Sequence, residues 1–287
     1  MKMPSLFMKI LRYSPLLALS IGCFSFHFFY VYPFRRGFFC DDQSLKYPHF
    51  KNETIPKFLC FSIWGLLVSS VLLLSKLFLK LPLEQPLRHF LTGFIICLFL
   101  TDLSKHWIGR LRPYFLTMCN PDYPTICYDE TAFYTIDDSK EQHFDEFFQK
   151  YVTDDDSIIC KNVTVDEIRE ARLSFISGHA STSFYCAAFL MIFISNIKTQ
   201  VRHIKHVLFI CYLLIFSLAS FISISRISDF KHHSLDVFIG AIVGSLISCF
   251  FNIISFPQES LISFKRGNSE QTEETKEVRW SNKILFQ

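Results

Sequence analysis

The residues best suited to chemistry in this sequence lie in one polar cluster that runs from Ser225 to Asp236. Within it, His232 and Asp236 are four residues apart, so a helix that begins here stacks both side chains on one face. The carboxylate can then hold one imidazole nitrogen while the other faces a substrate, which activates a histidine as a nucleophile. His233 is one step further round such a helix and cannot make the same contact. The competing interpretation is a polar loop with a basic, histidine-rich rim.

A second cluster, residues 105–113, carries two cations at the end of an apolar run. Lys105 and Arg112 are seven residues apart, close to two helical turns, so a continuing helix would aim both at one side before Pro113 turns the chain away. Two cations on one side suit a shared anion. Cations at the end of a membrane helix also extend toward lipid headgroups, and this stretch taken alone favours that simpler interpretation.

The third cluster is the tripeptide Ser177-Gly178-His179, which comes immediately before another apolar run. A small, flexible dipeptide at a helix start exposes backbone N–H groups and the positive end of the helix dipole, which together bind anions. His179 would then lie beside the bound group. A helix-capping serine followed by an interfacial histidine explains the tripeptide equally well.

Considered together, the three clusters supply the parts of a phosphate site. All lie at helix ends on the same predicted face, and they offer a group of N–H donors, two histidines, one orienting carboxylate and three cations, Lys105, Arg112 and Arg226. This set is sufficient for phosphoryl transfer without a metal. The sequence has no Asp-rich or His-rich metal motif, and we expect neither a metal nor another cofactor.

The composition is that of a membrane protein. Half of the 287 residues are hydrophobic and 17% are aromatic, including 34 Phe, which leaves too little polar surface for a water-soluble domain. We therefore predict an all-α, polytopic membrane protein with about six transmembrane helices. The third is the weakest, because Asp102 and Lys105 lie in its last turn. The apolar runs lie near 14–34, 58–80, 89–104, 180–197, 207–225 and 235–256.

The chain divides into a cytosolic N-terminal segment (1–13), a six-helix membrane domain (14–256) and a cytosolic tail (257–287). The first apolar run is longer than a signal-peptide core, so we expect it to be retained. Residues 113–172 form the only large polar loop, which we expect to cover the site on the non-cytosolic side.

Charge and glycosylation signals bear on the orientation. Basic residues in the N-terminal segment and in the second and fourth loops place these parts in the cytosol, although the first loop is also basic. The acceptor sequons at Asn52 and Asn162 fall in loops that this topology puts outside the cytosol, which favours it.

Six of the ten cysteines fall in apolar segments and are expected to be small packing residues. The other four, Cys40, Cys119, Cys127 and Cys160, lie in non-cytosolic loops, where disulfides can form. Because three of them crowd into one loop, we predict one bridge among Cys119, Cys127 and Cys160, with the pairing left open.

At the level of these motifs, the sequence resembles the lipid phosphate phosphatases of the type 2 phosphatidic acid phosphatase and vanadium haloperoxidase superfamily. Their three signatures read Lys-x6-Arg-Pro, Pro-Ser-Gly-His and Ser-Arg-x5-His-x3-Asp, and the resemblance covers most of residues 15–256. One departure is Ile176, which stands where the superfamily often has proline. No reacting group is lost by this change.

The resemblance implies roles for individual residues. His232 would attack phosphorus to form a phosphohistidine, Asp236 would orient it, and His179 would protonate the departing lipid alkoxide. The activity would be metal-independent. The non-bridging oxygens would be held by Lys105, Arg112, Ser177, Gly178 and Arg226.

The resemblance also implies a substrate and a location. The substrate would be phosphatidate, lysophosphatidate, sphingosine 1-phosphate or ceramide 1-phosphate, in the plasma membrane or a secretory-pathway membrane, with the site facing the extracellular or lumenal side. A homo-oligomer is compatible with it, and no nucleic-acid partner is expected. The alternatives are a phosphoryl or phospholipid-headgroup transferase, a non-catalytic signalling scaffold, and a transporter or receptor.

Overall fold

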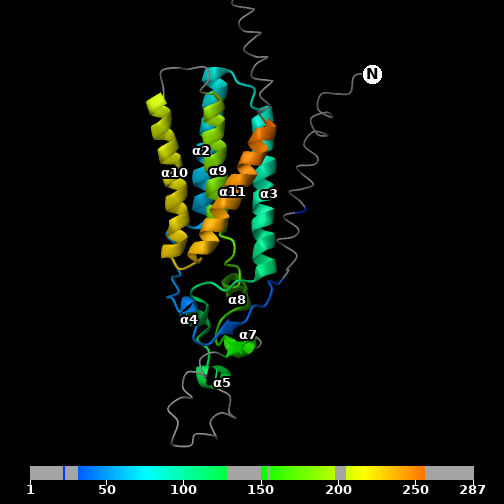
Figure 1. The fold of residues 1–287 in the computed structure, drawn as a ribbon, viewed down its shortest axis with the longest axis vertical. Coiled ribbons are helices and arrows are strands. Elements are labelled where there is room, and N and C mark those ends of the chain that lie inside the picture. The colour runs from blue at the N-terminus through cyan, green and yellow to red at the C-terminus, as the bar shows by residue number, and fades with distance from the viewer. Residues whose placement is uncertain (1–21, 23–31, 128–149, 154–155, 198–204, 256–287) are drawn as a thin grey trace, which may run out of the picture.

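Five long helices stand side by side in the computed structural model, which describes residues 22, 32–127, 150–153, 156–197 and 205–255 (Figure 1). All five are long and apolar enough to cross a membrane. The prediction of an all-α, polytopic membrane protein is therefore confirmed, apart from one two-stranded pair outside the helices. The remaining predicted span, 14–34, lies almost wholly outside the described residues. The helices are α2 (Lys57–Leu79), α3 (Glu84–Ile108), α9 (Gly178–Ile197), α10 (Lys205–Ser228) and α11 (Ser234–Ser255).

Helix α9 is the centre of the bundle. In its membrane-spanning window 67% of the residues are buried, against 22–28% in the other four helices. It packs closely on α11, where a Cβ at Gly244 would lie 2.1 Å from the Ser181 carbonyl oxygen and one at Gly240 would lie 2.8 Å from the Ser177 carbonyl oxygen. Small residues thus let two helix backbones approach. This contact brings the start of α9 next to the start of α11.

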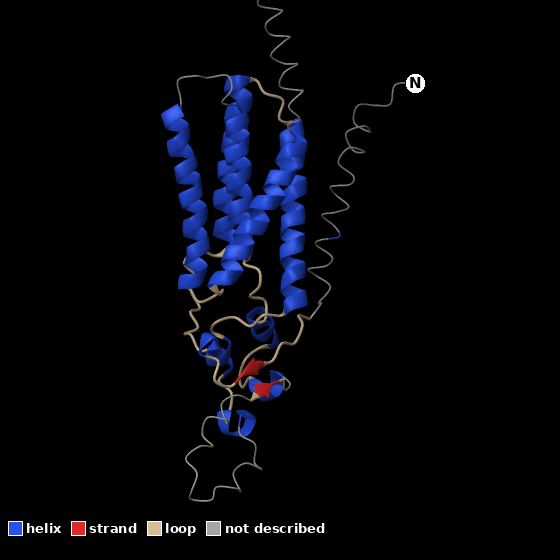
Figure 2. Cartoon of the chain, in the orientation of Figure 1, coloured by secondary structure: helices blue, strands red, loops and turns tan. Residues whose placement is uncertain are grey.

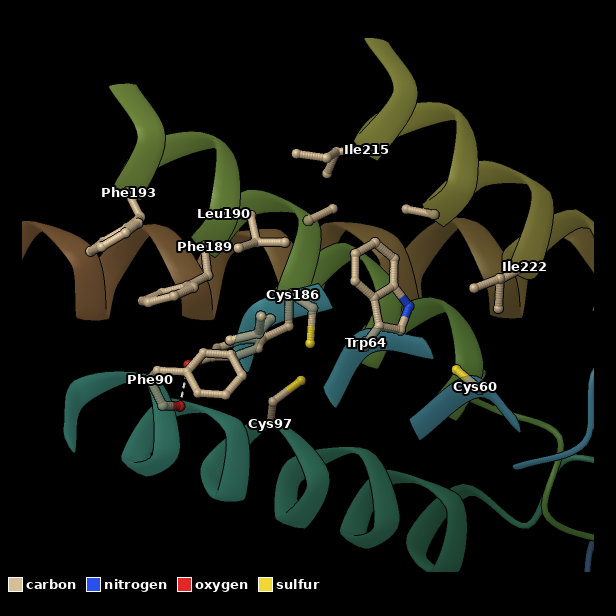
Figure 3. Packing of buried hydrophobic residues seen from close by; sticks show 14 of the residues in the cluster. Cys60, Trp64, Phe90, Cys97, Cys186, Phe189, Leu190, Phe193, Ile215 and Ile222 are labelled. Atoms are coloured by element: carbon tan, nitrogen blue, oxygen red, sulfur yellow. Dashed lines mark hydrogen bonds between the residues drawn. The ribbon is translucent and has the colours of Figure 1, made fainter. Parts of the chain in front are cut away.

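Aromatic and aliphatic side chains fill the space between the helices (Figure 3). The polar atoms among them are paired, since Trp64 Nε1 donates to Ser183 Oγ at 2.9 Å and the Tyr185 hydroxyl donates to the Phe90 carbonyl at 2.7 Å. Burial of polar atoms is tolerated only with such partners. Three of the cysteines expected to be packing residues, Cys60, Cys97 and Cys186, are buried in this cluster.

A small lobe covers one end of the bundle (Figure 2). It joins the segment before α2 to the segment between α3 and α9 through the antiparallel pair Phe38–Phe39 and Tyr151–Val152. Disulfides link Cys40 to Cys127 and Cys119 to Cys160. The second is one of the pairings that the sequence left open, whereas no partner was predicted for Cys40. The short elements are β1 (Phe38–Phe39), the 3-10 helix η1 (Gln43–Leu45), α4 (Phe115–Cys119), α5 (Tyr123–Cys127), β2 (Tyr151–Val152), α7 (Asp156–Ile159) and α8 (Val165–Ala171).

Candidate active site

A cavity of about 470 Å³ holds most of the predicted site residues together. It is lined from the segment before α2, from α2, α3, α8 and α9, from the end of α10 and from the loops that follow α3 and α10. The remaining two predicted residues, Ser177 and Asp236, do not line it. Those that do are Lys105, Arg112, Gly178, His179, Arg226 and His232.

The end of α3 sets the position of the two cations of the second cluster. The helix ends at Ile108, because Gly109 turns the chain with a φ of 56°, and a Cβ there would lie 1.8 Å from the Phe34 carbonyl oxygen. Only glycine fits this turn. The expected continuous helix from Lys105 to Arg112 is therefore wrong. Both side chains reach the cavity nevertheless, Lys105 from the helix and Arg112 from the loop after it.

Arg112 is buried and oriented by the lobe. Its backbone N–H donates to the Ala171 carbonyl at 2.8 Å, and its Nη2 donates to Glu170 Oε1 at 2.6 Å. Its Nε is buried without a hydrogen-bond partner among the described residues. A buried guanidinium donor without a partner is costly and suits an anion that binds there.

The start of α9 provides the second side of the cavity. Gly178 has no side chain, and the Lys105 ammonium lies 3.3 Å from where its Cβ would be. The hydroxyl of Ser177 is buried and, within the described parts of the chain, has no hydrogen-bond partner. Its backbone N–H donates to the Asp236 carbonyl at 3.1 Å, so this group is not one of the free N–H donors that we expected. His179 Nε2 lies 3.0 Å from the Ile55 carbonyl oxygen.

His232 lies in the turn between α10 and α11, since α11 begins only at Ser234. Its Nδ1 is 2.6 Å from the Ser174 carbonyl oxygen. A carbonyl oxygen can only accept, so Nδ1 carries the proton and Nε2 keeps the lone pair. His232 is 4% exposed and lines the cavity.

The predicted contact between His232 and Asp236 is wrong. Because His232 precedes the helix, the four-residue spacing does not stack the two side chains. The buried Asp236 carboxylate instead accepts hydrogen bonds from Ser174 Oγ and Arg110 Nη1, both at 2.6 Å, and from the His233 backbone N–H at 3.1 Å. Among the described residues, Ser174 therefore links the side chains of Asp236 and His232, since its hydroxyl donates to the carboxylate and its carbonyl accepts from the imidazole.

The segment that carries Ser174 is anchored on both sides. Arg172 makes a buried ion pair with Asp156 and donates to the Arg36 carbonyl at 2.9 Å. The Ser174 backbone N–H donates to the Arg110 carbonyl at 3.0 Å. The lobe thus holds the carbonyl that orients His232.

Burial and charge in the site keep His232 neutral and Glu170 ionised. Burial, with help from Arg112 and Lys105, holds the pKa of His232 well below its usual range. Burial opposes ionisation of Glu170, but the charges of Arg112 and Lys57 outweigh it and lower the pKa of this carboxyl to about 2. Near neutral pH the site therefore combines a neutral imidazole at His232 with cations and the ionised carboxylate of Glu170.

The lowered pKa of His232 makes a prediction about stability. Below a pH of about 6.5 the unfolded chain binds a proton on this residue that the folded chain does not, so stability is lost as the pH falls. We expect the unfolding temperature in detergent to drop between pH 7.5 and pH 5.5, and to drop less in His232→Gln. His49 and His233 also have lowered pKa values, so some dependence remains. An equal drop in the variant would contradict the buried, neutral state.

Comparison with known proteins identifies the family of the chain. A family model described as the PAP2 superfamily matches residues 86–259. The chain belongs to the PAP2 superfamily. The PAP2 match runs from the first turns of α3 to just beyond α11, so it contains all three clusters.

Several PAP2 relatives are similar over most of their length. The chain is 33% identical to phospholipid phosphatase 1 of Mus musculus over 233 residues, which cover 75% of this chain and 73% of the relative. It is 32% identical to phospholipid phosphatase 1 of Rattus norvegicus with the same coverage, and 28% identical to phospholipid phosphatase 2 of Mus musculus over 76% and 75% of the two chains. No solved structure matches the chain.

Six residues that line or support this site were not predicted from the sequence. Arg110 and Lys231 stand inside the clusters and could have been noticed as additional cations. Glu170 and Ser174 stand just before the Ser177-Gly178-His179 cluster, and Glu53 and Lys57 come from a distant segment. No local pattern distinguished these four. The missed residues are Glu53, Lys57, Arg110, Glu170, Ser174 and Lys231.

Proposed function

We propose that this protein is an integral membrane enzyme that hydrolyses a phosphorylated lipid to the dephosphorylated lipid and inorganic phosphate. The observation that carries the proposal is a cavity with two kinds of wall. Cations and histidines line one part, and apolar side chains line another, so a phosphate held by the cations would leave its lipid chain in apolar surroundings. The names of the PAP2 relatives support the same activity. The apolar wall consists of Phe61, Ile95, Leu98 and Phe99.

In the first step, Nε2 of His232 attacks the phosphorus atom. A P–N bond forms and the P–O bond to the lipid breaks. The departing alkoxide takes a proton from Nε2 of His179, which enters this step as the imidazolium and leaves it as the neutral imidazole. This Nε2 is the atom that lies against the Ile55 carbonyl in the structure. The products are a phosphohistidine and a lipid alcohol.

In the second step, water attacks the phosphorus of the phosphohistidine. The water gives a proton to His179, the P–N bond breaks, and the electron pair returns to Nε2 of His232. Inorganic phosphate leaves. Lys105, Arg112 and Arg226 stabilise the charge on the non-bridging oxygens in both transition states, so the mechanism needs no metal ion.

One further donor belongs to the phosphate site in this proposal. Nε of Arg112, a residue that lines the cavity, has no partner in the described residues, and a phosphoryl oxygen would satisfy it. The Ser177 hydroxyl also lacks a partner there, but it lies behind the cavity lining, so its phosphate-binding role rests on the resemblance alone. Gly178 lets the Lys105 ammonium approach the start of α9. This arrangement supports the phosphate-binding roles that the resemblance implies for Lys105, Arg112 and Gly178.

Ser174 provides a test of how His232 is positioned. Ser174→Ala removes the hydroxyl that joins Asp236 to the segment holding His232. We expect kcat to fall roughly tenfold to a hundredfold with KM nearly unchanged, because a misplaced reacting group costs rate rather than binding. Steady-state kinetics would measure this. Ser223→Ala removes another buried serine hydroxyl, bonded within α10, and should leave activity intact. Equal losses in the two variants would contradict the role of Ser174.

The topology is also part of the proposal. Asn52 and Asn162 are exposed and lie near the lobe that covers the site. Glycosylation of either would put the site on the extracellular or lumenal side, with the N-terminal segment and the tail in the cytosol. Phosphatidate, lysophosphatidate, sphingosine 1-phosphate and ceramide 1-phosphate all fit a cavity that joins cations to an apolar wall.

The activity can be tested by phosphate release from these four lipids in detergent, with EDTA present. The proposal expects release from at least one of them and no loss on chelation. His89→Ala, at the opposite end of α3 from Lys105, is a control that should behave as the wild type. No release from any of the four would refute the proposal.

A further inference from the structure

A short segment before α2, Glu53 to Ile55, lies against the site and contacts three of its elements. Glu53 Oε2 is 3.0 Å from Arg226 Nη1. Thr54 donates to Asp229 from its backbone N–H at 2.9 Å and from its hydroxyl at 2.6 Å. The Ile55 carbonyl accepts from His179 Nε2. The Thr54 bonds fix the segment, so Glu53 and Ile55 are held on residues that the proposed reaction uses.

Every nitrogen of the Arg226 guanidinium is occupied. Nε donates to Ser225 Oγ at 3.3 Å and Nη2 donates to Asp229, and both partners belong to the end of α10 or the residue after it. These contacts orient the side chain. Only Nη1 bonds to a distant segment, through Glu53, which lines the cavity. A phosphate bound by Nη1 in this orientation would therefore take the place where Glu53 now lies.

Lys231 faces the same position. It lines the cavity and is 6% exposed, yet its Nζ lies 3.8 Å from Glu53 Oε1, which is too long for a hydrogen bond. Its other contact is the Tyr114 ring, 5.0 Å away. Among the described residues this ammonium has no hydrogen-bond acceptor. Burying an ammonium without a hydrogen-bond acceptor costs free energy. An anion that lay slightly closer to Nζ than the Glu53 carboxylate does would accept a charge-assisted hydrogen bond from it.

We propose that the Glu53 carboxylate occupies the position of a substrate phosphoryl oxygen between Arg226 and Lys231, so that Lys231 is a further phosphate-binding residue and substrate must displace Glu53. The carboxylate stands in for the phosphoryl oxygens, and the Ile55 carbonyl stands in for the lipid oxygen that His179 protonates. The inference rests on the proposed function.

The charges of the cavity support displacement. Five cationic and three anionic side chains line it, which gives a small positive excess while Glu53 is in place. Moving Glu53 out raises this excess by one charge as a phosphate dianion enters. The lining charges are Lys57, Lys105, Arg112, Arg226 and Lys231 against Glu53, Asp102 and Glu170.

The test measures orthophosphate binding to the purified full-length protein by titration calorimetry. Glu53→Gln should bind phosphate about tenfold more tightly, and Lys231→Gln about tenfold more weakly, since one charge-assisted hydrogen bond is gained or lost. Asn52→Gln is the matched control, because it changes the exposed neighbour of Glu53 and should bind as the wild type. Glu53→Gln keeps the sequon, so its effect cannot come from a lost glycan.

The two substitutions should change phosphate affinity in opposite directions, which a purely structural role of both residues would not produce. Weaker binding in both variants, or no change in either one, would overturn it. So would absence of binding in both the wild type and Glu53→Gln. If Glu53→Gln does not fold, Glu53→Asp shortens the carboxylate and should also tighten binding, and a failure to do so would overturn the inference.

The same experiment separates this inference from the proposed function. Tighter phosphate binding by Glu53→Gln in a protein that hydrolyses no lipid phosphate would refute the function alone. Hydrolysis by a wild type whose phosphate affinity is insensitive to both substitutions would refute the inference alone.

Discussion

Replacing His232 with alanine should lower phosphate release from a lipid phosphate by a factor of about a thousand or more. The reason is that His232 supplies the atom that attacks phosphorus, and no neighbouring group takes over this role. His233 is adjacent, but its Nε2 lies 3.1 Å from the Leu111 carbonyl oxygen and it does not line the cavity. Release of inorganic phosphate from detergent-dispersed lipid measures the loss.

The matched comparison is His233→Ala, which should cost far less activity than His232→Ala. Orthophosphate binding provides a control for folding, because the cations of the site remain in His232→Ala. An active His232→Ala variant would mean that another group attacks phosphorus. Comparable losses from both histidines would mean that the turn between α10 and α11 was disrupted.

Replacing His179 with alanine should have a second large effect, but one that depends on the leaving group. A lipid alkoxide is a poor leaving group and needs a proton, so we expect a loss of roughly a hundredfold to ten-thousandfold with a lipid phosphate. Nitrophenolate leaves without a proton. Hydrolysis of p-nitrophenyl phosphate should therefore be much less affected.

The ratio of kcat/KM for the two substrates is the quantity to measure in the wild type and in His179→Ala. A strong shift of this ratio toward p-nitrophenyl phosphate supports a general acid. An equal loss with both substrates would show that His179 contributes to binding or to folding instead of protonating the leaving group.

Much of the cavity could be predicted because its residues lie in short clusters at helix ends. Apolar runs locate the helices, and the end of a membrane helix is where a cation or a histidine reaches water. The predicted start of the third span, 89–104, was too late by five residues and its end too early by four, because the charged ends of α3 (Glu84–Ile108) are helical too. Hydropathy does not detect such polar ends.

The errors arose where tertiary contacts override local spacing. A spacing of four residues indicates a contact only inside a helix, and His232 lies in a turn that is held by Ser174, far away in the sequence. Likewise the glycine turn after α3 moves Arg112 off the helix without removing it from the cavity.

Two of the missed residues, Glu53 and Lys57, belong to a segment far from all three clusters. Glu53 reaches Arg226 across the fold, and the pairing of Cys40 with Cys127 depends on the small lobe. A single sequence carries no signal for such contacts, because each requires two distant segments to be already in place.

The most direct test of the mechanism is to trap the phosphorylated enzyme. The wild type would be mixed with lysophosphatidate labelled with radioactive phosphorus, quenched with alkali within one turnover, and digested for peptide mapping in the presence of EDTA throughout. We predict a label that is stable to alkali, released by acid, and carried by the peptide that contains His232. Turnover without any labelled protein, or with the label on another residue, would contradict a phosphohistidine formed at His232.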